Sequence, residues 1–437
     1  MPHLINSNGY SSLIERLNRF PQGAPPSELL AKILALLFTD KEAELVSRLP
    51  IRPFTAGMAA QLWGMREVEA FRMLEGLADR ALMLDSVQQD GEKIYVLPPP
   101  IAGFFDFSLM RARPDIDQKA LSELLYQYLN MEEDFVRSLF IEGKTRLGRI
   151  MVGEDEIAPA NVTRVLNYER ASEVIKGAWK IGVGTCYCRQ KMHHVGRACA
   201  ASMEMCMTFN TVADPLIRHG HAREIDRVEC LDLLQQAREQ NLLQFAENAQ
   251  GGVSFICNCC GCCCEAMIAA RKFSNLKPVH TSNFVAGLRL DLCSGCGRCI
   301  DACPVEAVSL VSANDAQHHW MRKCVQDSER CLGCGICARV CRSGALFLVP
   351  RAERVITPVD GAHRVVLMAI ERDKLQHLIW DNQALFSHRA MAAILGVILR
   401  LPPVKQALAS SQLGSRYLHA MIQRKADIAV RPIIQRY

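Results

Sequence analysis

CSGCGRCIDACP, residues 293–304, and CLGCGICARVCR, residues 331–342, each place four cysteines in the pattern C-x2-C-x2-C-x3-C. In paired runs of this kind, three closely spaced thiolates hold one [4Fe–4S] cluster and the fourth reaches across to the other. Zinc sites usually use two separated ligand pairs, so the matched runs favour iron over zinc. The spacing therefore predicts two clusters, one held by Cys293, Cys296, Cys299 and Cys341, and the other by Cys331, Cys334, Cys337 and Cys303.

Glycines stand at equivalent places in both runs. Gly295 and Gly297 lie in the first run, and Gly333 and Gly335 lie in the second. We expect positive φ at these positions, with backbone amides close to the cluster sulfurs. Apolar segments also follow both runs, so the two halves form a pseudo-twofold repeat.

This repeat resembles the bacterial two-cluster ferredoxin module, and the resemblance covers residues 285–350. Two features depart from that family. Arg342 stands where the second run would have proline, and we expect this cation to raise the potential of the neighbouring cluster slightly. The connection between the runs is longer than in compact members, and we expect it to contact a partner through His318, His319, Trp320 and Lys323.

Composition restricts the class of protein. The chain has 437 residues, of which 49% are hydrophobic and 22% charged, which is typical of a globular protein of about three domains. The sequence opens with neither a basic region nor an apolar run, so we expect no secretion signal. Twenty cysteines then indicate metal ligands in a reducing cytoplasm rather than a disulfide scaffold.

A second group of cysteines lies upstream. Six of them fall within eight residues, CNCCGCCC at 257–264, which is far denser than the scatter expected of buried free cysteines. We expect a subset of ten thiols to hold a third [4Fe–4S] cluster. The ten are Cys186, Cys188, Cys199, Cys206, Cys257, Cys259, Cys260, Cys262, Cys263 and Cys264.

Two alternatives stay open for these thiols. One is a structural zinc ion bound by the first four of the ten, Cys186, Cys188, Cys199 and Cys206. The other is a redox-active thiol or persulfide site, with pKa values lowered by Arg189, Lys191 and Arg197. Cys230 and Cys324 stand alone, and we expect both to be small buried hydrophobes.

Between the cysteine groups, periodicity predicts a helix over 222–240 and a strand over 252–256 that leads into the CNCCGCCC run. The combination of a C-x-C-R segment, this run and a C-terminal dicluster resembles a group of ferredoxin-type 4Fe–4S proteins of anaerobes, over residues 28–410. The resemblance implies electron transfer and names no substrate.

The N-terminal region has a separate pattern. Helices are predicted at 28–37, 54–64 and 65–77, followed by strand-like runs at 82–84 and 94–97. This order resembles a winged helix-turn-helix over residues 28–100. That region carries 8 Lys and Arg against 11 Asp and Glu, whereas a DNA reader needs a basic face. We therefore expect a docking or dimerising domain and not a DNA-binding one.

The rest of the chain is predicted to be helical. Residues 121–141 form a helical stretch, in which Tyr126, Tyr128 and Phe135 are assigned to the core. Residues 342–437 carry 14 Lys and Arg against 6 Asp and Glu. Their apolar run at 390–399 is too short to span a membrane, so we expect a partner-docking helix, with a membrane-surface helix as the alternative. A further amphipathic helix is predicted at 413–422.

These patterns together predict an α+β multidomain protein. Its expected parts are an N-terminal extension (1–27), a winged-helix-like domain (28–100), a helical linker region (101–180), a cysteine-rich α/β domain (181–284), a dicluster ferredoxin domain (285–350) and a basic helical tail (351–437). The predicted function is single-electron relay between a low-potential donor and a partner oxidoreductase, in a cytoplasmic protein of anaerobic metabolism. The sequence leaves open whether the protein is an enzyme, and it favours an electron-transfer component or subunit of an oxidoreductase system over a stand-alone enzyme. The alternatives are an iron–sulfur redox-sensing transcription regulator and a reductase that acts at the cysteine-rich site.

Overall fold

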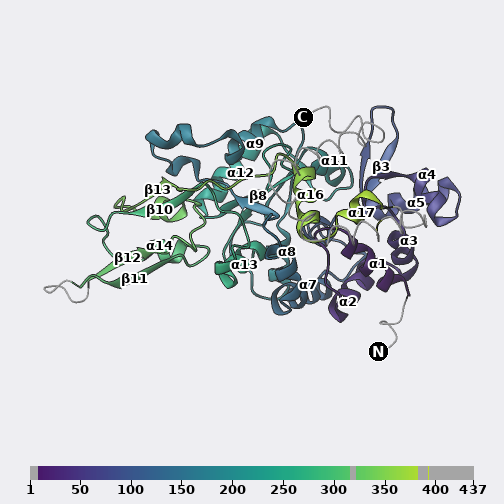
Figure 1. Ribbon diagram of the computed structural model, residues 1–437, viewed down its shortest axis with the longest axis horizontal. Coiled ribbons are helices and arrows are strands. Elements are labelled where there is room, and N and C mark those ends of the chain that lie inside the picture. Colours follow the sequence, from purple (N-terminus) through teal and green to yellow (C-terminus); the bar gives the residue numbers. More distant parts are fainter. Residues whose placement is uncertain (1–7, 315–320, 382–391, 393–437) are drawn as a thin grey trace. The chain divides into compact units, whose positions relative to one another are not determined.

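The computed structural model describes residues 8–314 and 321–381 together with Ala392 (Figure 1). The chain divides into two compact units, which we call the N-terminal unit and the cysteine unit. The N-terminal unit comprises residues 1–145, 211–223 and 361–437, and the cysteine unit comprises residues 146–210 and 224–360. All twenty cysteines fall within the cysteine unit.

The N-terminal unit begins with helices and a small sheet. Its first elements are α1 (Asn8–Arg19), α2 (Glu28–Leu37), α3 (Asp40–Ser47), β1 (Phe54–Thr55), α4 (Ala56–Trp63), α5 (Glu67–Ala78), β2 (Leu84–Val87) and β3 (Lys93–Val96). The strands pair antiparallel in the order β1-β3-β2, with Tyr95 opposite both Phe54 and Asp85. Residues 28–37 thus form the helix that the sequence predicts.

Several boundaries in this region differ from the prediction by one or two residues, among them those of α5 and β3. The helix expected from residue 54 begins at Ala56, because Phe54 and Thr55 pair with β3 and the Thr55 hydroxyl caps α4 by accepting the Met58 N–H at 3.3 Å. The strand expected at 82–84 begins only at Leu84, since Ala81 has a positive φ of 52° that belongs to the turn after α5.

The remaining elements of the N-terminal unit are short helices and irregular turns: η1 (Pro100–Phe104), α6 (Phe105–Phe107), α7 (Gln118–Tyr126), η2 (Gln127–Met131), α8 (Asp134–Phe140), α11 (Asn210–Arg218), α16 (Gly361–Glu371) and α17 (Leu375–Ile379). The helical stretch predicted over 121–141 is not one α-helix, because α7 continues into η2 and residues 132–133 then interrupt the helix before α8. Tyr128 and Phe135 are buried with ring centroids 5.1 Å apart, which confirms their assignment to the core, whereas Tyr126 is only half-buried.

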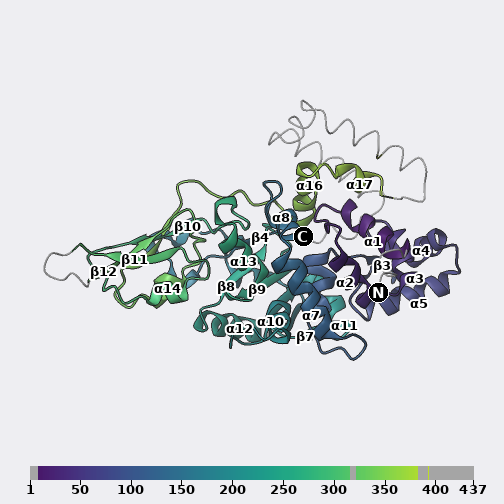
Figure 2. The same cartoon turned by 90° about the horizontal axis from the view of Figure 1, so that it is seen from below.

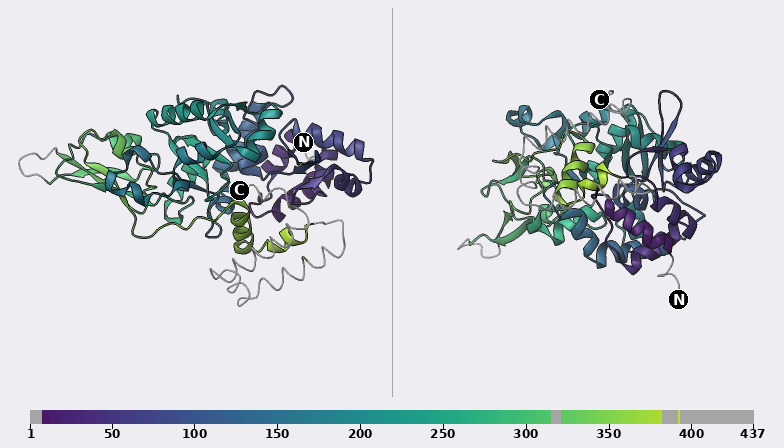
Figure 3. Two further views of the ribbon diagram at one scale, coloured as in Figure 1. Left: turned by 90° about the horizontal axis from the view of Figure 1, so that it is seen from above. Right: turned by 45° about the vertical axis from the view of Figure 1, so that its right-hand side comes forward.

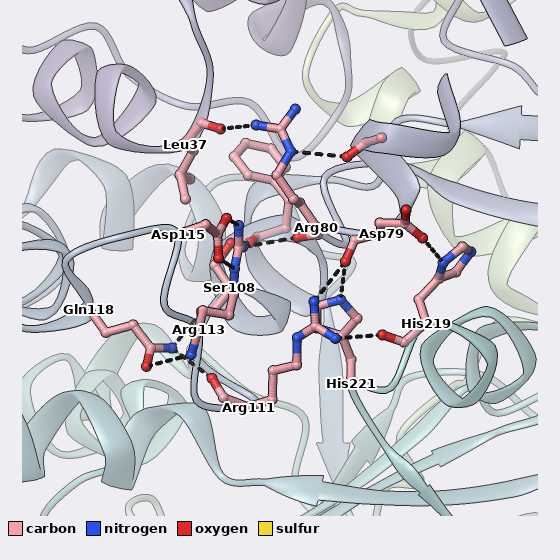
Figure 4. A network of polar contacts seen from close by, with 12 residues as sticks. Leu37, Asp79, Arg80, Ser108, Arg111, Arg113, Asp115, Gln118, His219 and His221 are labelled. Carbon is pink, nitrogen blue, oxygen red and sulfur yellow. Dashed lines mark hydrogen bonds and ion pairs between the residues drawn. The ribbon is translucent and has the colours of Figure 1, made fainter. Parts of the chain in front are cut away.

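A polar network joins distant segments of the N-terminal unit (Figure 4). Arg111 donates to the carbonyl oxygens of Asp79 (2.8 Å) and His219 (2.6 Å), while Arg113 donates to the Arg80 carbonyl at 3.0 Å. These bonds satisfy carbonyls at the end of α5 that the helix itself leaves without partners. They fasten residues 211–223 to the end of α5 despite their separation in sequence.

The cysteine unit is built on an antiparallel sheet, which Figures 2 and 3 show from other sides. The strand order is β4-β8-β9-β6-β5-β7. Its elements are β4 (Gly148–Ile150), η3 (Glu154–Glu156), η4 (Pro159–Arg164), η5 (Asn167–Glu169), α9 (Ala171–Gly177), β5 (Ile181–Thr185), α10 (Tyr187–His194), β6 (Glu204–Phe209), β7 (Arg223–Glu224), α12 (Arg227–Glu239), β8 (Leu243–Glu247), β9 (Phe255–Cys259), α13 (Glu265–Lys272) and η6 (Ser274–Leu276). Ile175, Met207, Phe209 and Ile256 belong to its buried core.

Two predictions in this sheet need correction. The helix expected over 222–240 begins at Arg227, because Asp226 accepts the Glu229 N–H at 2.8 Å and acts as the N-cap. The strand expected over 252–256 instead runs from Phe255 to Cys259, because β9 pairs with β8 as far as Cys259. Two cysteines of the CNCCGCCC run therefore lie on a strand and not in the loop after it.

The ferredoxin-like part of the cysteine unit contains β10 (Phe284–Leu288), α14 (Arg298–Ala302), β11 (Val308–Ser312), β12 (Arg322–Gln326), α15 (Ile336–Val340) and β13 (Leu346–Pro350). β10 pairs with β13 and β11 with β12, in two separate antiparallel ladders. Each half supplies one helix and strands to this arrangement, which is the pseudo-twofold repeat expected from the sequence.

Several predictions lie outside the described residues: the contacts of His318, His319 and Trp320, and the helices over 390–399 and 413–422, apart from Ala392. Within the described part of the chain, no helix has both the length and the apolar character needed to cross a membrane.

Candidate metal centres

Two cavities in the ferredoxin-like part divide the eight cysteines of the paired runs. Cys293, Cys296, Cys299 and Cys341 line one cavity of about 340 Å³, and Cys303, Cys331, Cys334 and Cys337 line the other, of about 370 Å³. Both volumes include space open to solvent. In each cavity three thiols come from one run and the fourth comes from the other, which is the division that the spacing predicts.

The glycine loops hold these thiols against neighbouring backbone. Gly295, Gly297, Gly333 and Gly335 have φ values of 70°, 80°, 72° and 89°, as the sequence predicts. A Cβ atom on Gly295 would overlap the carbonyl oxygen of Arg322, and one on Gly333 would overlap that of Phe284. Both positions therefore need glycine for two reasons, the left-handed backbone and the close approach.

Backbone amides donate to one thiol of each cavity. Ala307 N–H donates to Cys303 Sγ at 3.2 Å, and Cys324 N–H donates to Cys293 Sγ at 3.4 Å. Such bonds stabilise negative charge on cluster ligands and raise reduction potentials. Lys323, which was expected to contact a partner, donates to the Cys293 carbonyl at 2.6 Å.

Burial raises the pKa of thiols in the cavity that contains Cys303. Desolvation raises the pKa of Cys334 to about 12 and also raises those of Cys337 and Cys303. These groups are thus neutral thiols at pH 7 in the absence of metal, and iron binding must displace their protons. A donor set of four cysteines, with no nitrogen or oxygen ligand among them, fits a [4Fe–4S] cluster.

The upstream thiols are positioned first by β9. Cys257 and Cys259 lie two residues apart, so their side chains project from the same face of the strand. Cys206 on β6 lies directly opposite Cys257 in the antiparallel register. Asn258 faces the other side, where it donates to the Met205 carbonyl at 3.0 Å and accepts from Gln244 at 3.1 Å. These bonds fix the strand and so fix the thiol-bearing face.

The N-termini of α10 and α13 lie beside the thiols of this region. Cys186 is the N-cap of α10 and Cys264 is the N-cap of α13, and the buried Lys191–Glu265 ion pair joins the two helices. Helix N-termini favour thiolates electrostatically. Hydrogen bonds from Cys188 and Cys259 lower the pKa of Cys264 to about 6.

Successive thiol contacts link six cysteines, which we call the six-thiol set: Cys186, Cys188, Cys264, Cys259, Cys257 and Cys206. The contact of Cys264 with Cys259 is 3.1 Å.

The other four upstream cysteines form a separate, tighter group, which we call the compact group: Cys199, Cys260, Cys262 and Cys263. Their four sulfur atoms lie within 4.8 Å of one another, with 3.6 Å between Cys262 and Cys263 and 3.9 Å between Cys263 and Cys199. A hydrogen bond from Cys263 lowers the pKa of Cys260 to about 4. The ten upstream cysteines thus divide into two groups, and Cys186, Cys188 and Cys206 of the predicted zinc set do not join Cys199.

Arg189 lies beside both groups. Its side chain is only 1% exposed, and it donates to the Asn258 carbonyl at 3.1 Å. Burial would lower the Arg189 pKa, but the nearby thiols of Cys186, Cys260 and Cys259 raise it. Lys191, which was also expected to acidify these thiols, is instead neutralised by Glu265.

Both cysteines that stand apart in the sequence are buried. Cys230 is 0% exposed with its Sγ 3.7 Å from Met207 Sδ, as expected of a core residue. Cys324 is 1% exposed but does not stand alone, because it lines the cavity that contains Cys293 and its Sγ lies 3.8 Å from that of Cys299.

Sequence reasoning predicted a turn at Gly261 but missed its contact with Pro304. A Cβ there would lie 2.6 Å from the carbonyl oxygen of Pro304, so the tip of the CNCCGCCC loop touches the residue that follows Cys303.

Comparison with known proteins identifies the class of the paired runs. A family model described as a 4Fe-4S dicluster domain matches residues 292–345. No curated protein and no solved structure matches the chain. Together with the cysteine groups, the dicluster match shows that this is an iron–sulfur protein that binds [4Fe–4S] clusters, and such a domain indicates electron transfer.

Proposed function

We propose that the protein relays single electrons between a low-potential donor and a partner oxidoreductase. The observation that carries this proposal is the division of eight cysteines into two cavities, four in each. We assign Cys293, Cys296, Cys299 and Cys341 to one cluster and Cys303, Cys331, Cys334 and Cys337 to the other. A [4Fe–4S] cluster supplies one-electron redox chemistry when bound.

The protein's own contribution is to hold the ligands rigidly. Four thiolates in each cavity leave no ligand position for a substrate, which favours relay over catalysis. Since Cys303 and Cys341 each cross to the opposite half, the two centres share one scaffold and electrons pass between them over a short distance. The N–H donors at Ala307 and Cys324 stabilise the reduced, more negative state.

We place the predicted third cluster at the six-thiol set. No three of its thiols gather within 4.8 Å among the described residues, so the set does not suit a single ion. Neighbouring thiols such as Cys264 and Cys259, 3.1 Å apart, are too close to bind different irons of one cubane, so only a subset of the six would be ligands. The contact of Gly261 with Pro304 supports a path from this region to the cavity that contains Cys303. In this proposal the six-thiol set is an electron port to the dicluster domain.

A reducing cytoplasm suits these features. All twenty cysteines are free thiols, and Cys262 is exposed, so an oxidising compartment would consume the ligands before metal could bind.

For the N-terminal unit we propose a winged-helix fold used for docking. The order of α3, β1, α4, α5, β2 and β3, with a β1-β3-β2 sheet, supports this fold. The exposed face of α5 carries Val68 (61% exposed) and Phe71 (41%) beside Glu67, Glu69 and Arg72, and Glu69 pairs with Arg66. A partly apolar face of mixed charge suits a protein partner better than DNA, whose phosphates need a basic face.

The test is an EPR-monitored redox titration of the full chain purified without oxygen. We expect two interacting one-electron centres in the dicluster domain, of which Cys334→Ser removes one and Cys296→Ser the other. Cys230→Ser is the matched control, because this buried cysteine lies in neither cavity. Stopped-flow oxidation of the reduced chain by a viologen dye should then show one-electron phases.

Two results would contradict the relay. One is loss of both centres in each variant together with loss of the fold. The other is turnover of a disulfide or thioester substrate that Cys259→Ser abolishes and Cys334→Ser spares, which would make the chain a reductase. A salt-sensitive shift of duplex DNA would contradict the docking role of the N-terminal unit.

A further inference from the structure

The compact group has the size of a single-metal site. A tetrahedral zinc ion with bonds of about 2.3 Å to sulfur holds its four ligands about 3.8 Å apart. The distances of 3.6 Å and 3.9 Å between sulfurs of this group bracket that value. All four sulfurs lie within 4.8 Å of one another, so they can reach one ion together.

A cubane does not fit the same four thiols. In a [4Fe–4S] cluster each cysteine binds a different iron atom, which keeps the cysteine sulfurs about 6 Å apart. The paired runs provide an internal comparison, because neither of their sets of four is gathered within 4.8 Å, although every one of those cysteines is described. The four sulfurs of the compact group therefore lie closer together than the four cysteine sulfurs of either ferredoxin-like cavity.

Charge supports the same conclusion. Four thiolates around one divalent ion carry two net negative charges, which a buried site must balance. Arg189 is buried beside Cys260 of the compact group and beside Cys186 and Cys259 of the six-thiol set, so its charge can balance a centre at either group, and its Nε and Nη2 have no hydrogen-bond partner among the described residues. The described residues also supply it with no carboxylate partner. A negative metal–thiolate centre would supply the missing counter-charge.

We propose that Cys199, Cys260, Cys262 and Cys263 bind one zinc ion in a closed tetrahedral site, separate from every iron–sulfur cluster of the chain. Four protein ligands leave no position for water or substrate, so the role is structural. Cys199 lies 64 residues from Cys263, in the segment between α10 and β6. The ion would fasten that segment to the loop between β9 and α13, whose tip touches Pro304.

This site does not depend on the relay. Zinc has no redox chemistry, and its presence would stand even if the dicluster domain served another purpose. Zinc and iron are also measured separately, so either proposal can fail alone.

The experiment is metal analysis and zinc-edge X-ray absorption on the full chain purified without oxygen. We expect one zinc per chain with four sulfur neighbours at about 2.3 Å. Cys262→Ser changes the one exposed thiol of the group and so disturbs packing least. A chelator should remove zinc from this variant at least about tenfold faster than from the wild type, with the iron content unchanged.

Two control variants separate the metals. Cys230→Ser should retain both zinc and iron, whereas Cys334→Ser should lose iron and retain zinc. After chelation of the wild type, amide hydrogen exchange should increase in residues 196–203 and 260–264, because the ion ties these segments together.

The proposal is overturned by wild-type protein without zinc, by zinc with nitrogen or oxygen neighbours, or by a single iron ion in the four-sulfur site. Loss of iron in place of zinc from Cys262→Ser would equally overturn it, since it would show that the compact group belongs to a cluster.

Discussion

Gly333→Ala should remove one cluster and leave the other. Gly333 lies in the second glycine loop, between Cys331 and Cys334, with φ of 72°. An alanine Cβ there would overlap the Phe284 carbonyl oxygen and lie 2.8 Å from its carbon. Two hydrogen bonds from Ser282 hold the loop in place, so it cannot easily move away from Phe284. The Ser282 hydroxyl donates to the Gly333 carbonyl at 2.6 Å, and the Ser282 N–H donates to the Leu332 carbonyl at 3.0 Å.

The expected loss of stability in Gly333→Ala has two parts. Placing alanine in a left-handed conformation costs about 1–2 kcal/mol. Overpacking against fixed backbone adds about 1–3 kcal/mol. Gly344→Ala is the matched control, because Gly344 has a similar φ of 67° but nothing within 4 Å of its would-be Cβ. The difference between the two variants isolates the steric part.

The assay is iron content and EPR of both variants, purified without oxygen and challenged with an iron chelator. For Gly333→Ala we expect iron to fall by up to four per chain and one of the two signals to disappear. Gly344→Ala should keep both signals. Equal iron retention in the two variants would refute the reasoning, because the contact with Phe284 would then have no influence on the cluster.

Three further predictions concern other contacts. His219→Asn should destabilise the N-terminal unit more at pH 6 than at pH 9. The hydrogen bond to Asp85 raises the pKa of His219, so the protonated imidazole stabilises the folded state. This stabilisation is fully present below about pH 6.5, and it is lost as the pH rises through the raised pKa. The ratio of proteolysis rates, variant to wild type, measures it at each pH, and a ratio independent of pH would contradict it. Gly261→Ala should lower the unfolding temperature of the cysteine unit by overpacking Pro304, whereas Gly177→Ala, with open space around it, should not; calorimetry compares the two. Arg339→Gln should destabilise by about 1–3 kcal/mol and speed iron loss to a chelator, because it leaves the buried Glu156 carboxylate without the Arg339 Nε donor at 2.6 Å; unchanged iron loss would show that this ion pair is dispensable.

The paired runs could be interpreted from sequence because their chemistry is local. Spacing and glycines specify loops whose geometry hardly depends on the rest of the chain, so both the positive φ values and the sharing of cysteines between cavities follow from them. The boundaries of helices and strands were harder to predict from the sequence. The helix break between α7 and α8 and the start of β9 at Phe255 depend on packing and strand pairing that periodicity does not contain.

The division of the upstream thiols into two groups could not be predicted from the sequence. Cys259 and Cys260 are neighbours in sequence, yet they enter different groups, because Cys259 is the last residue of β9 and Cys260 begins the turn. Cys263 and Cys264 also belong to different groups, because Cys264 is the N-cap of α13. Only the register of β6 with β9 shows that Cys206 faces Cys257 and not Cys199.

In these proposals one ligand type serves two kinds of centre, and backbone geometry makes the difference. In the paired runs, glycines with positive φ space the thiols around a cavity wide enough for a polynuclear cluster. In the CNCCGCCC loop, Gly261 lies against Pro304, and the sulfurs of Cys260, Cys262 and Cys263 lie within 4.8 Å of one another, close to the spacing around a single ion. Since the same loop also connects the six-thiol set to the dicluster domain, a fixed metal there would hold the proposed electron path at constant length.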